Sequence, residues 1–224
     1  MSGGICVSHT TAWAPGLVTP DDWKQWARGG KEIARTNDAP KLEYTDPLFR
    51  RRLSQISRMT IQVVHDELEK SNCGRTIRQV FVSCRGELAR EFSVSKMLIE
   101  DKAVLPASFS LSVFNTPIAL ATLAFALHGG YTVMFPSKGN FRGAFAGACA
   151  PVLSGSEEQI MLVYADELPV EEYSGLRTEN CVPFAFAALI SAEPGTGISL
   201  TDMEDVPQEP ATFLKQIILK DTSF

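Results

Sequence analysis

The residues best placed for chemistry lie at one sharp turn past the middle of the chain. Ser137 and Lys138 belong to the segment PSKGN, residues 136–140, which separates an apolar segment (YTVMF) from a run of small residues (FRGAFAGACA). The first segment is β-prone and the second is typical of a closely packed helix. A strand that leads through a sharp turn into such a helix is the layout of a nucleophile elbow, which presents one side chain to a substrate. The sequence therefore predicts a nucleophile position at this turn.

Four side chains are candidates for the nucleophile. They are Ser137 at the turn, Lys138 through its amine, Cys149 in the helix after the turn, and Cys84 at the end of the predicted strand 78–84. Activation needs an adjacent base or a lowered pKa. None of the three histidines (His9, His65 and His128) lies beside the turn in sequence. Cys149 lies more than two turns into its helix, where a small buried cysteine is the ordinary finding. We therefore favour a non-catalytic lysine at the turn, and keep an acyltransferase-like enzyme that uses Ser137 or Cys149 as the alternative.

The stretch around this turn resembles a known family. Ser110, Asn115, Gly129 and the small residues 143–148 follow the spacing of the β-ketoacyl synthase family, in the N-terminal half of its thiolase fold. In that register, Lys138 occupies the place of the family's nucleophilic cysteine. Lysine cannot form the acyl thioester that the family's condensation requires. The family's two catalytic histidines belong to its C-terminal half, and we expect no counterpart of them here.

The resemblance implies a non-catalytic subunit. Short chains of this kind are similar to the chain-length factors of aryl polyene biosynthesis, within polyketide and type II fatty-acid chemistry. Such a subunit pairs with an active β-ketoacyl synthase, as a heterodimer or a dimer of heterodimers, and meets the acyl carrier protein through that complex. It needs no cofactor, and the alternative is a scaffold subunit without length control.

The same resemblance assigns an interface and an acyl tunnel. The interface consists of Asn115 and the strand that precedes the elbow, whose residues are Tyr131, Thr132, Val133, Met134 and Phe135. The tunnel is lined from residues 107–114, which alternate small polar and apolar residues and therefore predict a strand or an extended loop. Alternation places Phe109, Leu111 and Val113 on one face and Phe114 on the other. Phe109 is the expected gate and Phe114 the second choice, and the alternative is that all four residues are core.

Two charged groups have both a structural and a functional interpretation. Arg50, Arg51 and Arg52 begin the clearest amphipathic helix, residues 49–71, and form either a solvated basic turn or a contact for an acidic carrier or partner. Asp166 and Glu167 end a predicted strand, where side chains of an α/β sheet often face a site. For these two acids we favour a surface turn.

Composition excludes several classes of function. A net charge of −5 provides no basic surplus for nucleic acid. The longest uncharged stretch, residues 104–137, contains polar residues and a Gly-Gly break, so we expect no membrane span. The five cysteines are scattered without CxxC spacing, which indicates reduced thiols in a cytoplasmic protein and no metal site.

The elements that position the elbow follow from hydrophobic periodicity and helix start signals. Helices are expected at residues 20–28, 49–71, 88–99, 116–127 and from 141. Strands are expected at residues 4–9, 78–84, 131–135, 159–165 and 182–192. A surface loop is expected at residues 194–210, and a short strand or a closing helix at residues 213–219. This order predicts an α/β fold, a mixed sheet covered by helices. Residues 1–193 form the ketosynthase-like half, and residues 194–224 a loop and tail packed on it.

Overall fold

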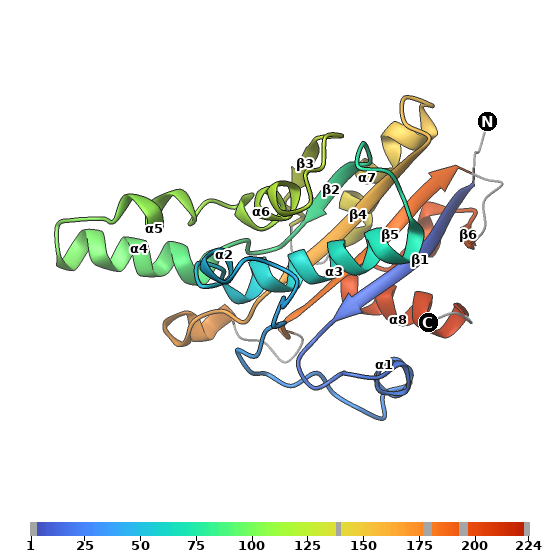
Figure 1. Ribbon diagram of the computed structural model, residues 1–224. Coiled ribbons are helices and arrows are strands. Elements are labelled where there is room, and N and C mark those ends of the chain that lie inside the picture. Colours follow the sequence, from blue (N-terminus) through green and yellow to red (C-terminus); the bar gives the residue numbers. More distant parts are fainter. Residues whose placement is uncertain (1–3, 138–139, 177–180, 193–196, 222–224) are drawn as a thin grey trace.

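The computed structural model describes residues 4–137, 140–176, 181–192 and 197–221 of the 224-residue chain. Its centre is a six-stranded mixed sheet (Figure 1). In spatial order the strands are β3 (Tyr131–Met134), β2 (Arg78–Val82), β4 (Gln159–Asp166), β5 (Phe184–Ala192), β1 (Ile5–Trp13) and β6 (Ile198–Leu200). The strands β3, β2 and β4 are parallel, and the remaining neighbours are antiparallel. The predicted α/β fold with a mixed sheet is confirmed.

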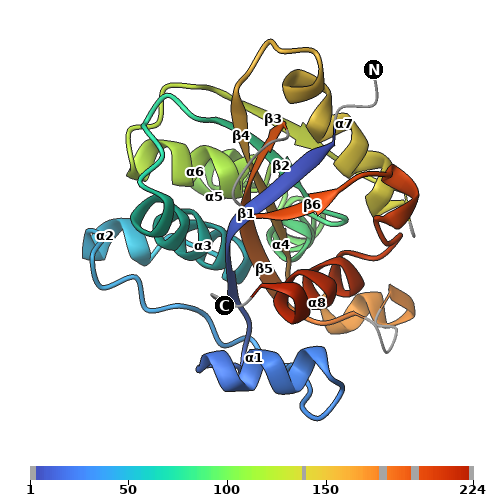
Figure 2. The ribbon, with the colours of Figure 1, turned by 90° about the vertical axis from the view of Figure 1, so that its right-hand side faces the viewer.

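The two faces of the sheet are both buried, as the sequence of β4 requires. Ile160, Leu162 and Tyr164 pack into one core cluster, while the alternate residues Met161 and Val163 pack into the other. One face is covered by α3 (Gln55–Ser71) and α6 (Thr116–Ala124), and the other by α1 (Pro20–Ala27), α7 (Phe141–Leu153) and α8 (Pro210–Lys220) (Figure 2). A strand buried on both faces reads as a continuous apolar run, which QIMLVYA is.

The tail is part of the main core. Phe213 of α8 lies 5.3 Å from the ring of Phe141, 5.2 Å from that of Phe145 and 5.9 Å from that of Phe186. The strand β6 pairs with β1, so residues 194–210 contain a strand where only a loop was expected. Of the two alternatives for residues 213–219, the helix is correct. Truncation of a buried phenylalanine costs about 3–5 kcal/mol, so α8 contributes substantially to the free energy of unfolding.

Several local signals have their predicted effect. Thr19 and Asp22 form the expected capping box at the start of α1. In contrast, the single helix predicted over residues 49–71 is interrupted. The short helix α2 (Pro47–Arg50) ends before Ser54, which caps α3 by accepting a hydrogen bond from the Ser57 N–H. The apolar periodicity continues across this break, which is why the sequence concealed it.

A helical arm projects from the body of the molecule. It consists of α4 (Leu88–Glu100) and α5 (Pro106–Ser110), which lie side by side beyond the sheet in Figure 1. The helix α4 buries only Val94, and α5 buries no residue. The expectation that residues 107–114 are extended is wrong, because Pro106 begins a helical turn there. No helix in the described ranges is long and apolar enough to cross a membrane.

Candidate functional site

The predicted strand–turn–helix layout is present between β3 and α7. Asn140 caps α7 by accepting a hydrogen bond from the Gly143 N–H at 3.3 Å. A Cβ atom on Gly143 would lie 2.6 Å from the Asn140 amide oxygen, and one on Gly147 would lie 3.2 Å from the Met134 methyl carbon. The small residues therefore let the helix approach its cap and the strand β3. Ser137 is exposed in the turn. Lys138 lies outside the described residues.

The two candidate thiols are not activated. Cys149 is fully buried in α7, and this burial raises the pKa of its thiol to about 12. Burial, and next the charge of Asp166, raise the pKa of the Cys84 thiol to about 12. Because the thiolate is the nucleophilic form, both groups stay protonated and unreactive at neutral pH. All five cysteines lie in the described part of the chain, and no disulfide joins any two of them.

The exposed Ser137 side chain has no base in the described part of the chain. No hydrogen bond there joins it to a histidine. The His65 ring is engaged elsewhere, since its Nδ1 lies 3.1 Å from the Asp66 carboxylate and it stacks on Tyr44 with the ring centroids 3.8 Å apart. The geometry thus provides no nucleophile–base pair for the alternative that uses Ser137.

Asp166 is buried at the carboxyl end of β4, and the expectation of a surface turn is wrong. Its carboxylate accepts hydrogen bonds from the Ser83 hydroxyl at 2.8 Å, the Cys84 N–H at 3.2 Å and the Arg85 N–H at 3.0 Å. The Tyr164 hydroxyl donates a further hydrogen bond to the same carboxylate. These bonds fix the loop of residues 83–87, which connects β2 to the arm. Asp166 therefore has a structural role.

Glu167 is likewise buried and joins two helix starts. One carboxylate oxygen accepts from the Ile56 N–H of α3 at 3.3 Å, and the other accepts from the Ala89 N–H of α4 at 3.3 Å. Glu87 lies beside it and accepts from the hydroxyls of Ser54 and Ser57. Burial, and next the charge of Glu87, raise the pKa of Glu167 to about 7. The arm is thus anchored to α3 through two buried carboxyl groups.

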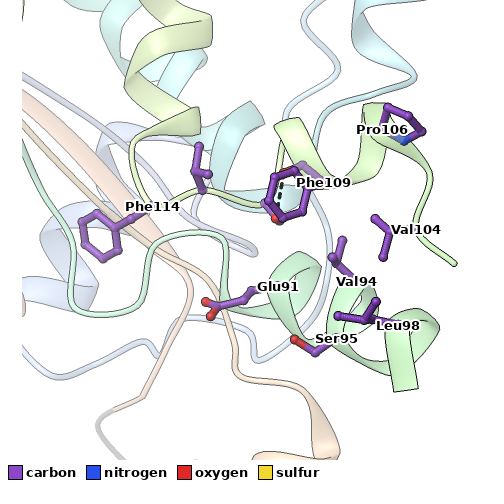
Figure 3. A pocket seen from close by; sticks show the side chains of 10 residues that line it. Glu91, Val94, Ser95, Leu98, Val104, Pro106, Phe109 and Phe114 are labelled. Atoms are coloured by element: carbon purple, nitrogen blue, oxygen red, sulfur yellow. Dashed lines mark hydrogen bonds between the residues drawn. The ribbon is translucent and has the colours of Figure 1, made fainter. Parts of the chain in front are cut away.

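A largely apolar pocket of about 840 Å³ lies between the two helices of the arm (Figure 3). Phe109 lines its middle and Phe114 one end, while Val104 and Leu98 line the other end. Glu91, Ser95 and Ser112 contribute the polar atoms. Its size is within the range of small-molecule sites. The sequence did not identify the residues that α4 contributes, although Val94 and Leu98 have the i, i+4 spacing of one helix face.

Three of the four predicted tunnel residues line this pocket, and one does not. Phe109, Val113 and Phe114 all line the pocket, so the expectation that Phe114 faces away from the other two is wrong. Leu111 is not among the lining residues. Phe109 is 61% exposed, which contradicts the alternative that it belongs to the core of this chain.

The predicted interface strand lies at the edge of the sheet. The strand β3 pairs only with β2 in the described sheet, so its outer side has no neighbour there. Asn115 donates a hydrogen bond to the Tyr131 hydroxyl at 2.9 Å, which joins the start of α6 to this strand. Phe135, directly after β3, is 68% exposed. An unpaired edge strand beside exposed apolar side chains is a surface suited to pairing.

The three consecutive arginines have different surroundings. Arg50 donates to the Leu42 carbonyl at 3.2 Å and thereby holds the loop before α2. Arg51 and Arg52 are exposed, and neither side chain makes a hydrogen bond or an ion pair with another described residue. Of the group, these two remain available as cations. Among the described residues, no cluster of His, Cys, Asp or Glu could hold a metal ion.

Comparison with known proteins agrees with this geometry. A family model described as the β-ketoacyl synthase N-terminal domain matches residues 23–216. The match continues through most of α8, beyond the limit of residue 193 expected from the resemblance. A search of curated protein sequences gives no significant match.

Three solved structures illustrate the similarity. A chain of a ketosynthase in complex with its chain length factor, from Xenorhabdus doucetiae, superposes with a TM-score of 0.78 at 19% identity, covering 97% of this chain and 92% of that chain. The ishigamide ketosynthase/chain length factor gives 0.67 at 12% identity, covering 87% of this chain and 64% of that chain. A chain from the complex of a type II polyketide acyl-carrier protein with its ketosynthase gives a TM-score of 0.63 at 16% identity, covering 85% of this chain and 64% of that chain. At these identities, the likeness establishes a shared thiolase-like fold.

Proposed function

The chain belongs to the β-ketoacyl synthase family, through its N-terminal domain, and we propose that it is a non-catalytic chain-length factor. In this role it pairs with an active β-ketoacyl synthase and shapes the acyl tunnel of that enzyme. The observation that carries the proposal is the sequence PSKGN, in which the resemblance to the family assigns Lys138 to the position of the nucleophile. Condensation requires a thiolate that accepts the acyl chain. The high pKa values of Cys149 and Cys84 make neither thiol a substitute.

The arm supports the role in length control. Its pocket is apolar and large enough for an acyl chain, and it is lined by Phe109 and Phe114. Exposed apolar side chains continue along the arm, namely Leu98, Ile99, Leu105, Phe109 and Val113. Contiguous apolar surface of this kind is typical of a protein interface or a ligand groove. A partner that covers the arm would convert the open pocket into an enclosed tunnel.

The partner is an active β-ketoacyl synthase that pairs along the edge strand β3, as a heterodimer or a dimer of heterodimers. Tyr131, Thr132, Val133, Met134 and Phe135 form this contact, together with Asn115. A stable interface should bury more than about 1,000 Å². Arg51 and Arg52 are free to contact an acidic carrier protein that serves the complex. The biosynthetic system is of the polyketide type, and we assign it to the aryl polyene branch on the resemblance to the chain-length factors of that branch.

Co-expression with an active β-ketoacyl synthase tests the proposal. We expect the two chains to co-elute as a complex that condenses malonyl units on the carrier protein. The purified chain alone should show no condensation, and Lys138→Cys should not create it, because none of the three histidines lies beside the turn in sequence. Malonyl-dependent condensation by the chain alone would contradict the proposal. A complex whose product length is unaffected by pocket substitutions would instead indicate a scaffold subunit.

A further inference from the structure

We infer that Gly86 is a positioning residue for length control. Because glycine has no side chain, the Phe114 ring can pack against the backbone of Gly86, and this contact determines where the pocket between α4 and α5 ends. The inference rests on the proposed function and adds to it the residue that positions the inner end of the pocket. Phe114 lines this end of the pocket, next to the body of the molecule (Figure 3). The position of its ring therefore decides how far an acyl chain can extend toward the elbow.

The Phe114 ring packs directly on the Gly86 backbone. A Cβ atom on Gly86 would lie 2.5 Å from Cδ2 of Phe114, 3.0 Å from Cγ and 3.1 Å from Cε2. These distances are much shorter than the separation of about 3.5–4.0 Å at which carbon atoms attract each other. Any side chain at position 86 would therefore displace either the loop or the ring.

The loop cannot easily retreat. The Gly86 N–H donates to the Ser83 hydroxyl oxygen at 2.8 Å, and this hydroxyl donates to Asp166 at 2.8 Å. The next residue, Glu87, is buried and accepts hydrogen bonds from Ser54 and Ser57 of the α3 start. Displacing the loop would break several buried hydrogen bonds, whereas Phe114 is only half-buried. The ring is the part that moves.

A second aromatic contact restricts that movement. Phe135 contacts Phe114 edge to face, with the ring centroids 5.7 Å apart. Phe135 follows the strand β3, which the partner covers in the proposed complex. Gly86 and Phe135 both contact the ring, and the pocket that Phe114 lines is the open space beside it, so we expect the ring to move into the pocket. A methyl group at position 86 therefore shortens the pocket.

The test uses the complex with an active β-ketoacyl synthase and reads product lengths by mass spectrometry. Gly86→Ala should shift the main product shorter by at least one extension unit. Gly86 has a φ of +56°, so alanine also adds backbone strain there. Gly155→Ala is the matched control, because Gly155 has a φ of +74° and no atom within 4 Å of its Cβ position. It should leave the product unchanged.

A second substitution separates contact from strain. Phe114→Leu alone should lengthen the product, and Gly86→Ala combined with Phe114→Leu should return to the length of Phe114→Leu. If Gly86→Ala prevents complex formation, rescue of the complex by Phe114→Leu supports the same contact, and a lack of rescue overturns the inference. An unchanged product from Gly86→Ala, while Phe114→Leu lengthens the product, also overturns it. If no pocket substitution changes the product, length control itself fails, which is the failure of the proposed function.

Discussion

Truncation of Phe109 distinguishes a role in the tunnel from a role in the core. Its ring is 61% exposed and lines the pocket of the arm, so Phe109→Ala should leave the melting temperature of the complex nearly unchanged. We expect longer products, because the enlarged pocket admits more of the chain at about 0.8 kcal/mol per added buried methylene. Mass spectrometry of the products measures this.

Leu111→Ala is the matched control for Phe109→Ala, because Leu111 lies in the same segment but does not line the pocket. It should not change product length. A normal product distribution from a stable Phe109→Ala complex would remove Phe109 from the tunnel.

Glu67 is an isolated buried acid in α3. Neither carboxylate oxygen makes a hydrogen bond of normal geometry within the described part of the chain, although Lys70, Thr11 and Ser71 partly oppose the effect of burial on its pKa. Burial raises the pKa of Glu67 from 4.5 to about 8. Since the folded state binds this proton more tightly than the unfolded state, the stability contribution of Glu67 is present below pH 4.5 and is lost as the pH rises through 8.

Glu67→Gln should remove this part of the pH dependence. At pH 9, we expect the variant to be more stable than the wild type by an amount on the order of a few kcal/mol. Denaturant unfolding at pH 5, 7 and 9 measures the difference. Glu167 adds a pH dependence of the same sign over a narrower range, from its usual pKa of 4.5 to about 7, and this part should persist in Glu67→Gln. An unchanged slope in Glu67→Gln would show that Glu67 is charged throughout.

Burial of such acids is what the sequence could not reveal. Asp166 and Glu167 directly follow an apolar run of residues, a pattern that fits both a surface turn and a buried junction. The outcome depends on donors from residues 54–57 and 83–89, far away in the chain. The burial of the Cys149 thiol could be predicted from the sequence, because its small apolar neighbours indicate a packed helix.

At the scale of elements, helix starts were predictable where a cap has a local signature. Thr19 and Asp22 identified the start of α1, while the break before Ser54 was missed because apolar periodicity continues across it. Residues 107–114 illustrate a different limit. Their alternation over a few residues suits a strand, but Pro106 and the contact with α4 produce a helical turn. Short segments take their structure from tertiary contacts.

The junction of α3 and α4 offers a prediction about both helices. Glu167→Ala removes the acceptor of the Ile56 and Ala89 N–H groups together. Loss of a helix cap costs about 0.5–2 kcal/mol, so the free energy of unfolding should fall, and amide exchange should accelerate in the first turns of α3 and α4. Hydrogen exchange measured by mass spectrometry resolves this.

The helix α6 provides the internal control for Glu167→Ala, because Glu167 makes no hydrogen bond to it. Its exchange should stay at the wild-type rate. Equal acceleration in all three helices would indicate global destabilisation instead of a local anchor.

At the scale of the whole molecule, the mixed sheet and its covering helices were predictable because hydrophobic periodicity is strong in the long elements. The projecting arm was not predictable, since α4 reads as an ordinary amphipathic helix and only the structure shows that one residue of it is buried. The partner chain of the proposed complex would cover both the exposed apolar surface of this arm and the edge of β3 that has no neighbour in the described sheet.

The geometry of β3 defines a sharp test of that partner. The N–H of Gln79 in β2 donates to the Gly130 carbonyl, and the N–H of Ser83, directly after β2, donates to the Met134 carbonyl. In a parallel ladder, every second residue of a strand directs its N–H and C=O groups toward the same neighbour. The backbone groups of Thr132 therefore face β2, and those of Tyr131 and Val133 face outward. The outward N–H of Val133 is therefore available to a second sheet, and its removal leaves the β2 ladder intact.

Val133→Pro should accordingly abolish or weaken the complex by more than tenfold, because proline removes the outward donor. Val133→Ala is the control, since it loses the same side-chain packing but keeps the N–H, and it should still form the complex. Size-exclusion chromatography at micromolar concentration with an active β-ketoacyl synthase compares the two. Equal binding by both variants would show that the partner does not pair along β3, whereas loss of binding by both would assign the effect to the Val133 side chain.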